Sequence, residues 1–210
     1  MTRHGEEDER LLSLADTFAR ARIEQAGSVR YAVARASSEV EEILRLRCRT
    51  VVDNGWADPA AFPDGVERDE FDDRAVHVGG RDGENLVACA RLVFPVAGHP
   101  LPTEKHFGVS LEPQGRVVEV GRVIVVPDHR AADRRIFLGL LAACWLELRA
   151  GGFHVMGGDA AEWLIQVYRD MGFEIRVIGP GGSYWGEHRY PILMDGLASV
   201  ESVIRKLGGA

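Results

Sequence analysis

The spacing of apolar residues divides the chain into helices and strands. Apolar side chains three and four residues apart predict amphipathic helices over 11–23, 40–51 and 197–207, and Arg22 falls on the apolar stripe of the first. The segment 133–150 is apolar almost all round, so we expect a buried helix there. Alternating or valine-rich runs predict strands over 29–36, 74–78, 86–94, 116–126, 153–158, 173–178 and 189–194.

Two of the predicted helices begin with a capping pattern. Ser38 and Glu41 are spaced as S-x-x-E, and Asp159 and Glu162 have the same spacing before a helix that ends near 171–172. The order of elements predicts an α/β domain with a mostly antiparallel sheet and one strand–helix–strand crossover near its middle. We expect residues 1–9 to be a flexible N-terminus and residues 10–210 to form a single domain.

Composition narrows the class of protein. The 210 residues are 46% hydrophobic and 27% charged, which suits a folded core and excludes a disordered chain. We expect no membrane span, because no stretch approaches the roughly 20 apolar residues that a spanning helix needs. The start, MTRHGEEDER, carries acids where a signal peptide carries basic and then apolar residues, and the three cysteines show no disulfide framework. These features predict a cytoplasmic protein.

Charge is unevenly distributed along the chain. The formal net charge of −7 argues against nucleic acid as a partner. Arg130, Arg134 and Arg135 nevertheless cluster where the buried helix begins, and a helix N-terminus flanked by arginines binds phosphate well. This cluster predicts an anionic ligand or partner; a solvated loop is the alternative reading.

Two charges interrupt the valine-rich strand over 116–126, namely Glu119 and Arg122. They would point to opposite faces of the sheet unless a bulge intervenes, and Gly121 is a suitable bulge site. A structural ion pair with other charged residues is one interpretation. The other is a carboxyl group whose pKa is raised by burial until it can act as a base near neutral pH.

The second half of the chain resembles the GNAT N-acyltransferase superfamily. The resemblance is carried by the strand RVVEVGRVIVV, a basic turn, a helix, a strand, and a helix ending in VYRDMGF at 167–173. It implies helices on both faces of a mixed sheet and two central strands that splay apart around the pantetheine arm of a thioester. The glycines of the usual phosphate loop are missing, since residues 130–135 read RAADRR.

Motifs in the first half narrow the resemblance to acyl-homoserine-lactone synthases and long-chain N-acyl amino acid synthases, over about residues 40–175. Gly121 stands where the lactone synthases usually have serine, and residues 101–106 look closer to the N-acyl amino acid branch. In chain order the motifs are Trp56, an E-x-D-x-x-D pattern of Glu67, Asp69 and Asp72, then Arg91 at a strand end, and an E-x-x-R element of Glu119 and Arg122.

The resemblance implies transfer of a medium or long fatty acyl group from an acyl-carrier-protein or CoA thioester to the amine of an amino acid or S-adenosylmethionine. Its catalytic residues would be Glu119, as the base acting directly or through a water, with Arg122 and Tyr168. Tyr168 would protonate the leaving thiolate, although an aromatic ring at this spacing is more often core. Backbone N–H groups around Val123 and Val125 would bind the oxyanion.

The remaining predicted roles concern substrate binding. A solvated acidic loop is the alternative for the E-x-D-x-x-D pattern, and Trp56 would cover either the acyl entrance or the core. Arg130, Arg134 and Arg135 would hold a carrier's phosphopantetheine. No metal and no permanently bound cofactor are expected. The acceptor pocket would be ordered by Glu67, Asp69, Asp72, Arg91 and Arg122.

Two alternatives stay open at this point. The chain could be an acetyl-CoA-dependent small-molecule N-acetyltransferase, or a non-catalytic module that binds acyl thioesters. The sequence also leaves open the amine acceptor, the acyl length, the choice between carrier protein and CoA, and the oligomeric state.

Overall fold

A computed structural model describes residues 3–126 and 134–208 of the chain. Within these residues one sheet of eight strands has the order β1-β2-β3-β4-β5-β8-β6, and β7 pairs with β8. All neighbouring strands are antiparallel except β4 and β5, which are parallel and joined by the α5 crossover. The strands are β1 (Val29–Val33), β2 (Ala75–Asp82), β3 (Asn85–Val93), β4 (Val117–Val125), β5 (Val155–Ala161), β6 (Ile175–Val177), β7 (Gly182–Tyr184) and β8 (Glu187–Asp195).

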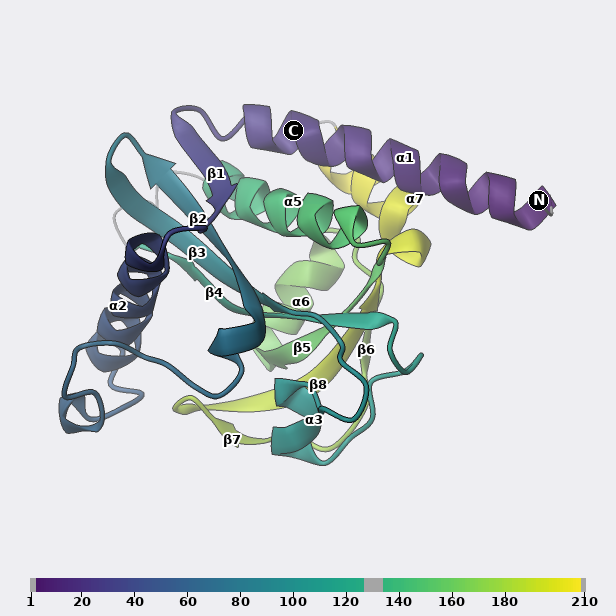
Figure 1. Ribbon diagram of the computed structural model, residues 1–210. Helices are drawn as coiled ribbons and strands as arrows, with labels where there is room; N and C mark the ends of the chain where they lie inside the picture. The colour runs from purple at the N-terminus through teal and green to yellow at the C-terminus, as the bar shows by residue number, and fades with distance from the viewer. Residues whose placement is uncertain (1–2, 127–133, 209–210) are drawn as a thin grey trace.

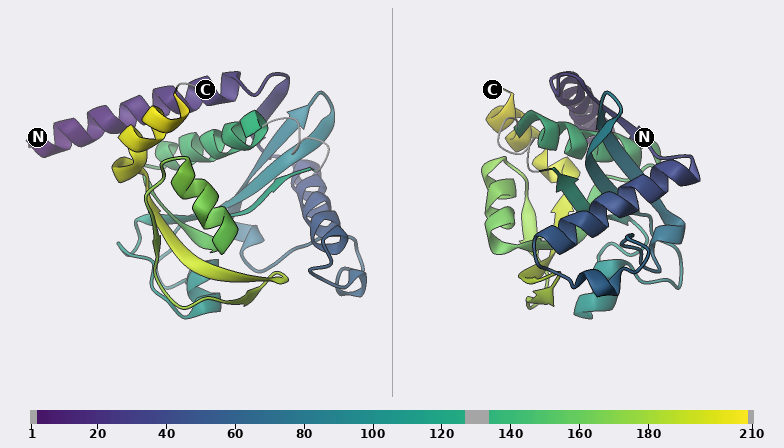
Figure 2. Two further views of the ribbon diagram at one scale, coloured as in Figure 1. Left: turned by 180° about the vertical axis from the view of Figure 1, so that it is seen from behind. Right: turned by 90° about the vertical axis from the view of Figure 1, so that its left-hand side faces the viewer.

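Helices cover both faces of the sheet (Figures 1 and 2). One face, called here the helical face, packs against α1 (Arg3–Glu24), α5 (Arg134–Ala150), α6 (Glu162–Asp170) and α7 (Gly196–Leu207). The opposite face, called here the polar face, packs against α2 (Ser37–Asp53), α3 (Pro102–Phe107) and the segment between α2 and β2, which holds the short helices η1 (Pro59–Ala61) and η2 (Asp72–Arg74).

Alternation along β3 explains how the two faces differ. Ala88, Ala90 and Leu92 point to the helical face and join the largest apolar core, together with side chains of α1 and α5. Cys89 and Val93 point the other way, to smaller apolar clusters, and Arg91 lies between them. A buried charge therefore faces the side of the sheet that carries the acidic segment.

The central strands β4 and β5 splay apart. Their pairing covers only Val117–Glu119 with 155–157, although β4 continues to Val125 and β5 to Ala161. At the fork the strands approach so closely that a Cβ on Gly158 would lie 2.8 Å from the carbonyl oxygen of Val120. Beyond the fork both strands line one cavity. The predicted fold is thus confirmed, a GNAT-like mixed and mostly antiparallel sheet with a splayed central pair.

Several local predictions were wrong. Helix α1 begins at Arg3, eight residues before the start predicted at Leu11; the flexibility of residues 1–9 stays a prediction. Helix α2 begins at Ser37, before the start that a Ser38 cap implies, and Glu39 accepts hydrogen bonds from the backbone of Arg35 and Ala36 in place of the Ser38–Glu41 box. Helix α3 and strand β7 were not predicted.

No helix within residues 3–126 and 134–208 combines the length and the apolar character that crossing a bilayer requires.

The fork makes a stability prediction. Gly158→Ala should lower the free energy of unfolding by about 1–3 kcal/mol, because the new methyl group collides with backbone that cannot rotate away. Gly121→Ala is the matched control, since a Cβ there meets nothing within 4 Å. Urea unfolding of both variants checks this; equal midpoints would contradict the close approach.

Candidate active site

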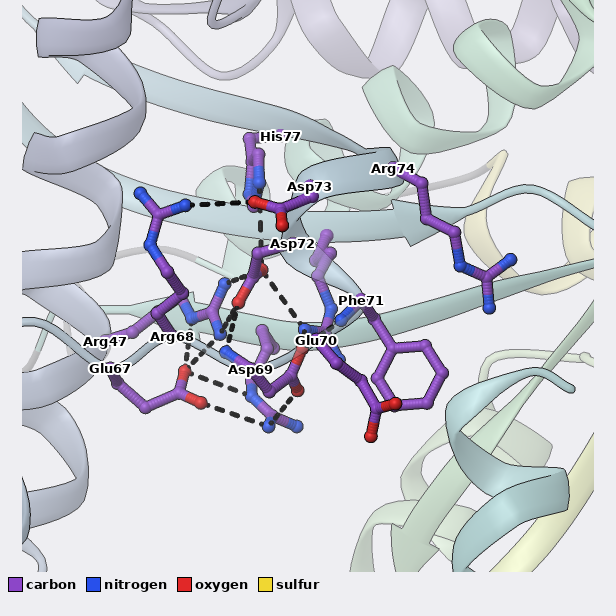
Figure 3. A network of polar contacts seen from close by, with 12 residues as sticks. Arg47, Glu67, Arg68, Asp69, Glu70, Phe71, Asp72, Asp73, Arg74 and His77 are labelled. Carbon is purple, nitrogen blue, oxygen red and sulfur yellow. Dashed lines mark hydrogen bonds and ion pairs between the residues drawn. The ribbon is translucent and has the colours of Figure 1, made fainter. Parts of the chain in front are cut away.

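A buried network of charges occupies the polar face of the sheet (Figure 3). Arg47 of α2 is fully buried and donates to Glu67 through Nε. Its two terminal nitrogens donate to Asp72, at 2.6 Å and 3.1 Å. Arg47 thus links Glu67 and Asp72 through charge-assisted hydrogen bonds in the interior of the protein.

Two arginines from the sheet complete this network. Arg91 donates to Asp69 at 2.6 Å and to Asp72 at 3.1 Å. Arg122 donates to Glu67 through two nitrogens, each at 3.2 Å, and to Asp69 at 3.2 Å. We call this network the charge cluster, and it consists of Arg47, Glu67, Asp69, Asp72, Arg91 and Arg122. Its three guanidinium groups balance its three carboxylates, which is the condition for burying charge.

The charge cluster determines the protonation states near it. Burial alone would raise the pKa of Asp72, but hydrogen bonds and charge from Arg47, with the charge of Arg91, hold that pKa well below its ordinary value. His77 lies 3.7 Å from Asp72, and burial lowers the pKa of its imidazole. Asp72 therefore stays ionised at neutral pH and does not act as a base.

A bulge in β4 brings Arg122 into the cluster. Gly121 pairs with Arg91 and Ile124 pairs with Cys89, so Arg122 and Val123 together stand opposite the single residue Ala90. Arg122 has a φ of 53°, in the left-handed region. The bulge turns Arg122 to the polar face, close to Arg91 of the neighbouring strand. A bulge at Gly121 was the condition under which the sequence predicted Glu119 and Arg122 on the same face.

Glu119 is isolated from the charge cluster. It is 4% exposed, and Thr103 of α3 donates to its two oxygens, from the backbone N at 2.8 Å and from the hydroxyl at 3.0 Å. Burial raises the pKa of Glu119 to about 7 in spite of these hydrogen bonds. Arg122, the neighbour in the E-x-x-R element, pairs with Glu67 and Asp69 and makes no ion pair with Glu119. The site thus separates the ionised Asp72 from Glu119, whose pKa is about 7.

A cavity of about 690 Å³ extends from the charge cluster between the splayed strands to the helical face. Its polar end is lined by Arg47 and Arg122 with Trp56 and Trp185, and the Arg122 guanidinium lies 4.4 Å from the Trp185 ring centroid. Its other walls are mainly apolar and come from α1, α5, α6, α7 and β8. The volume and lining suit a small polar group joined to a long apolar one.

A second ionic group lines the cavity, and the sequence did not predict it. Arg189 of β8 donates to Asp159 at 3.0 Å and to Glu187 at 2.9 Å, and its guanidinium lies 5.6 Å from the ring of Trp56. The sequence assigned Asp159 to a helix cap; instead it lies within β5, which continues to Ala161, and α6 starts at Glu162. Its pairing to Arg189 depends on the β5–β8 register, which no local pattern reveals.

The structure brings together the predicted residues Glu67, Asp69, Asp72, Arg91 and Arg122, joined by Arg47. Arg47 was missed as a site residue, although a charge on the apolar stripe of its helix was a usable signal. Thr103, the partner of Glu119, carried no signal of its own. The roles assigned to all these residues stay predictions.

The other predicted residues lie around the cavity. Trp56, Val123, Val125, Arg134 and Tyr168 line it. Tyr168 is buried between the rings of Phe137 and Phe173, and burial raises the pKa of its phenol well above the ordinary value. Arg135 is exposed next to Arg134, and Arg130 lies outside the described residues.

Among the described residues, no three His, Cys, Asp or Glu side chains gather as a metal-binding group would.

Comparisons with known proteins agree with this geometry. Residues 46–140 match the family model of the acetyltransferase (GNAT) domain. A search of the curated proteins finds no match. Solved structures with the same fold include the acyl-homoserine-lactone and N-acyl amino acid synthases, which confirms the resemblance predicted from the sequence.

Three of these solved structures illustrate the similarity. The CoA-dependent acyl-homoserine lactone synthase BjaI, in complex with SAM and isopentyl-CoA, has a TM-score of 0.65 and 22% identity, over 82% of this chain and 83% of that chain. The synthase LasI has a TM-score of 0.67 and 13% identity, over 86% and 94%. FeeM, an N-acyl amino acid synthase from uncultured soil microbes, has a TM-score of 0.66 and 15% identity, over 85% and 96%.

Removing the central guanidinium tests the charge cluster. Arg47→Met should lower the free energy of unfolding by about 3–5 kcal/mol, because it leaves two buried carboxylates short of a cation. Arg45→Met is the matched control on the same helix, as Arg45 is half exposed and pairs with Glu41 at the surface. Chemical unfolding measures the free energy of unfolding of both variants. A loss below about 1 kcal/mol for Arg47→Met would show that the charge cluster contributes little to stability.

The raised pKa of Glu119 predicts a pH-dependent stability. Because the folded pKa is about 7 and the ordinary value is 4.5, the folded state favours the protonated carboxyl. Stability from this group is full below the ordinary value and is lost as the pH rises to about 7. The unfolding free energy of the parent should therefore fall relative to Glu119→Gln across this range. A constant difference between the two proteins would show that Glu119 titrates normally.

Proposed function

We propose that this chain is an N-acyltransferase that moves a medium or long acyl group from an acyl-carrier-protein or CoA thioester to the amine of a small acceptor. The observation that carries the proposal is the fork between β4 and β5, which opens a mainly apolar cavity next to a buried carboxyl group with a pKa of about 7. The GNAT-domain match and the shared fold with acyl-homoserine-lactone and N-acyl amino acid synthases support acyl transfer.

The donor thioester would lie between the splayed strands with its acyl chain along the helical face. Val126 donates its backbone N–H to Val87 on β3, and successive N–H groups of a strand point to opposite sides. The N–H groups of Val123 and Val125 are therefore directed to the β5 side, where the thioester carbonyl would sit and where an oxyanion needs donors. The apolar walls beyond this point suit a fatty chain better than an acetyl group.

The acceptor amine would enter from the polar face. The charge cluster has its guanidinium and carboxylate groups fixed in a rigid array, and Arg122 presents one side of that array to the cavity together with Trp56 and Trp185. These groups would orient an amine that also carries charged substituents, such as an amino acid or S-adenosylmethionine. This assignment of the acceptor rests on BjaI and FeeM, whose names specify SAM and an N-acyl amino acid product.

Glu119 would remove the proton from the acceptor ammonium. Its side chain does not line the cavity, and Thr103 holds both oxygens, so the proton would pass through a water beside Val120 and Gly121. The neutral amine then attacks the thioester carbon, a C–N bond forms, and the C–S bond breaks as the tetrahedral intermediate collapses. Tyr168 lines the cavity as a protonated phenol and would return a proton to the thiolate.

Electrostatics at the start of α5 would guide an anionic donor. Arg134 lines the cavity mouth and Arg135 is exposed beside it, close to the expected position of a phosphopantetheine phosphate. Attraction between this basic end and an acidic carrier protein or CoA should weaken with added salt. A cytoplasmic location, where such thioesters are made, stays a prediction.

The proposal predicts an N-acyl product from a long-chain thioester. Mixtures of acyl-CoA or acyl-carrier thioesters with amino acids or S-adenosylmethionine should yield it, as detected by mass spectrometry. Its kcat/KM should rise with pH through an apparent pKa of about 7, as Glu119 ionises. Glu119→Gln should lower kcat by about 10²–10⁴-fold.

Glu201→Gln is the control, since Glu201 is an exposed acid on α7 away from the cavity. Unchanged turnover in Glu119→Gln would remove the base assignment. Faster turnover with acetyl-CoA than with every longer thioester would favour a small-molecule acetyltransferase. Tight thioester binding without product from any acceptor would identify a non-catalytic binding module.

A further inference from the structure

An arginine lies on the cavity wall at the helical face. Arg22 of α1 is only 9% exposed, although its helix lies at the edge of the molecule (Figure 1). It lines the same cavity as the splayed strands, next to Phe18 of its own helix, and Leu207 of α7 lines it as well. A cation is thus placed on a cavity wall that is otherwise mainly apolar.

Arg22 differs from the other buried arginines because it has no acidic partner within the described residues. Arg47, Arg91, Arg122 and Arg189 each hold carboxylates, as described above. The Arg22 guanidinium lies 4.7 Å from the centroid of the Phe18 ring, and its Nε is buried without a hydrogen-bond acceptor. No hydrogen bond or ion pair of this side chain occurs in the described part of the chain.

An unpaired buried cation is costly, and a single aromatic ring offsets only part of the cost. The buried Nε has no acceptor, and a cation–π contact with Phe18 compensates only part of the hydration that the guanidinium loses. An apolar residue at this position would avoid the penalty and extend the stripe of Ala15, Phe18 and Ala19. An anionic group that enters the cavity would remove it by supplying the missing acceptor oxygens.

The position of Arg22 indicates which part of a substrate would carry that anion. The charge cluster and Glu119 lie on the polar face, while α1 lies on the helical face, and the cavity connects the two faces through the fork. A thioester carbonyl held at the fork would direct its acyl chain along the apolar walls of α5, α6 and α7. The end of that chain, remote from the reacting carbon, would approach Arg22.

We infer that the preferred acyl group carries a terminal carboxylate, so that the donor is the half-thioester of a dicarboxylic acid. This inference rests on the proposed function and concerns its acyl donor. The planar guanidinium can donate two hydrogen bonds to one carboxylate, and the acids Asp159 and Glu187 of the cavity wall are paired to Arg189. Within the described residues no acid pairs with Arg22, so its terminal nitrogens are left to the substrate. A methyl-ended chain leaves Arg22 unpaired and binds more weakly for that reason.

The experiment compares straight-chain acyl-CoA thioesters of increasing length, each paired with the half-thioester of the dicarboxylic acid of equal length. Isothermal titration calorimetry measures binding without acceptor, and mass spectrometry measures kcat/KM with the acceptor present. At the length that reaches Arg22, the dicarboxylic thioester should bind at least about tenfold tighter than its methyl-ended counterpart. Arg22→Met should abolish that preference, and Arg22→Lys should keep part of it.

Arg20→Met serves as the control, because Arg20 is exposed on the same helix. Arg22→Met should fold at least as stably as the parent, since it removes an unpaired charge. Equal binding of both thioester classes at every length, or a preference that Arg22→Met leaves unchanged, would overturn the inference while leaving acyl transfer intact. Preferential binding without any N-acyl product would instead support the inference and contradict the proposed function.

Discussion

The polar face of this fold depends on one electrically neutral cluster of six charges, four of them buried and two partly buried. Arg47, from α2, fixes the segment that carries Glu67 and Asp72, and the sheet supplies the balancing arginines. Each group alone would be too costly to bury, so α2, the following segment and the sheet have to assemble together. The resulting surface presents charged groups in fixed positions.

The same face contains two electrostatic environments only a few residues apart. Asp72 accepts from two guanidinium groups and is kept ionised, while Glu119 receives neutral hydrogen bonds from Thr103 and titrates near neutrality. The difference follows from the partners and not from the depth of burial, since both side chains are nearly inaccessible. One kind of carboxylate can then organise a ligand while the other moves a proton.

Strong periodic signals predicted most of the helices and strands and the central crossover, and the family resemblance singled out the members of the E-x-D-x-x-D pattern. Failures arose where a local signal fits two structures. The D-x-x-E spacing at Asp159 suits a helix cap, but continued pairing with β8 keeps Asp159 in a strand and delivers it to Arg189. Thr103 became visible only through packing, because its partner Glu119 lies 16 residues away in the chain.

The fork divides the sheet into two parts that are joined through a short stretch of pairing between β4 and β5. Three residue pairs and the α5 crossover connect β4 with β5, whereas β2–β3 and β5–β8 are paired over eight and seven residue pairs. A molecule bound in the fork would contact both parts of the sheet, so its binding would stiffen the short connection between them. Occupancy and rigidity are therefore coupled by the way the strands are laid out, before any chemistry takes place.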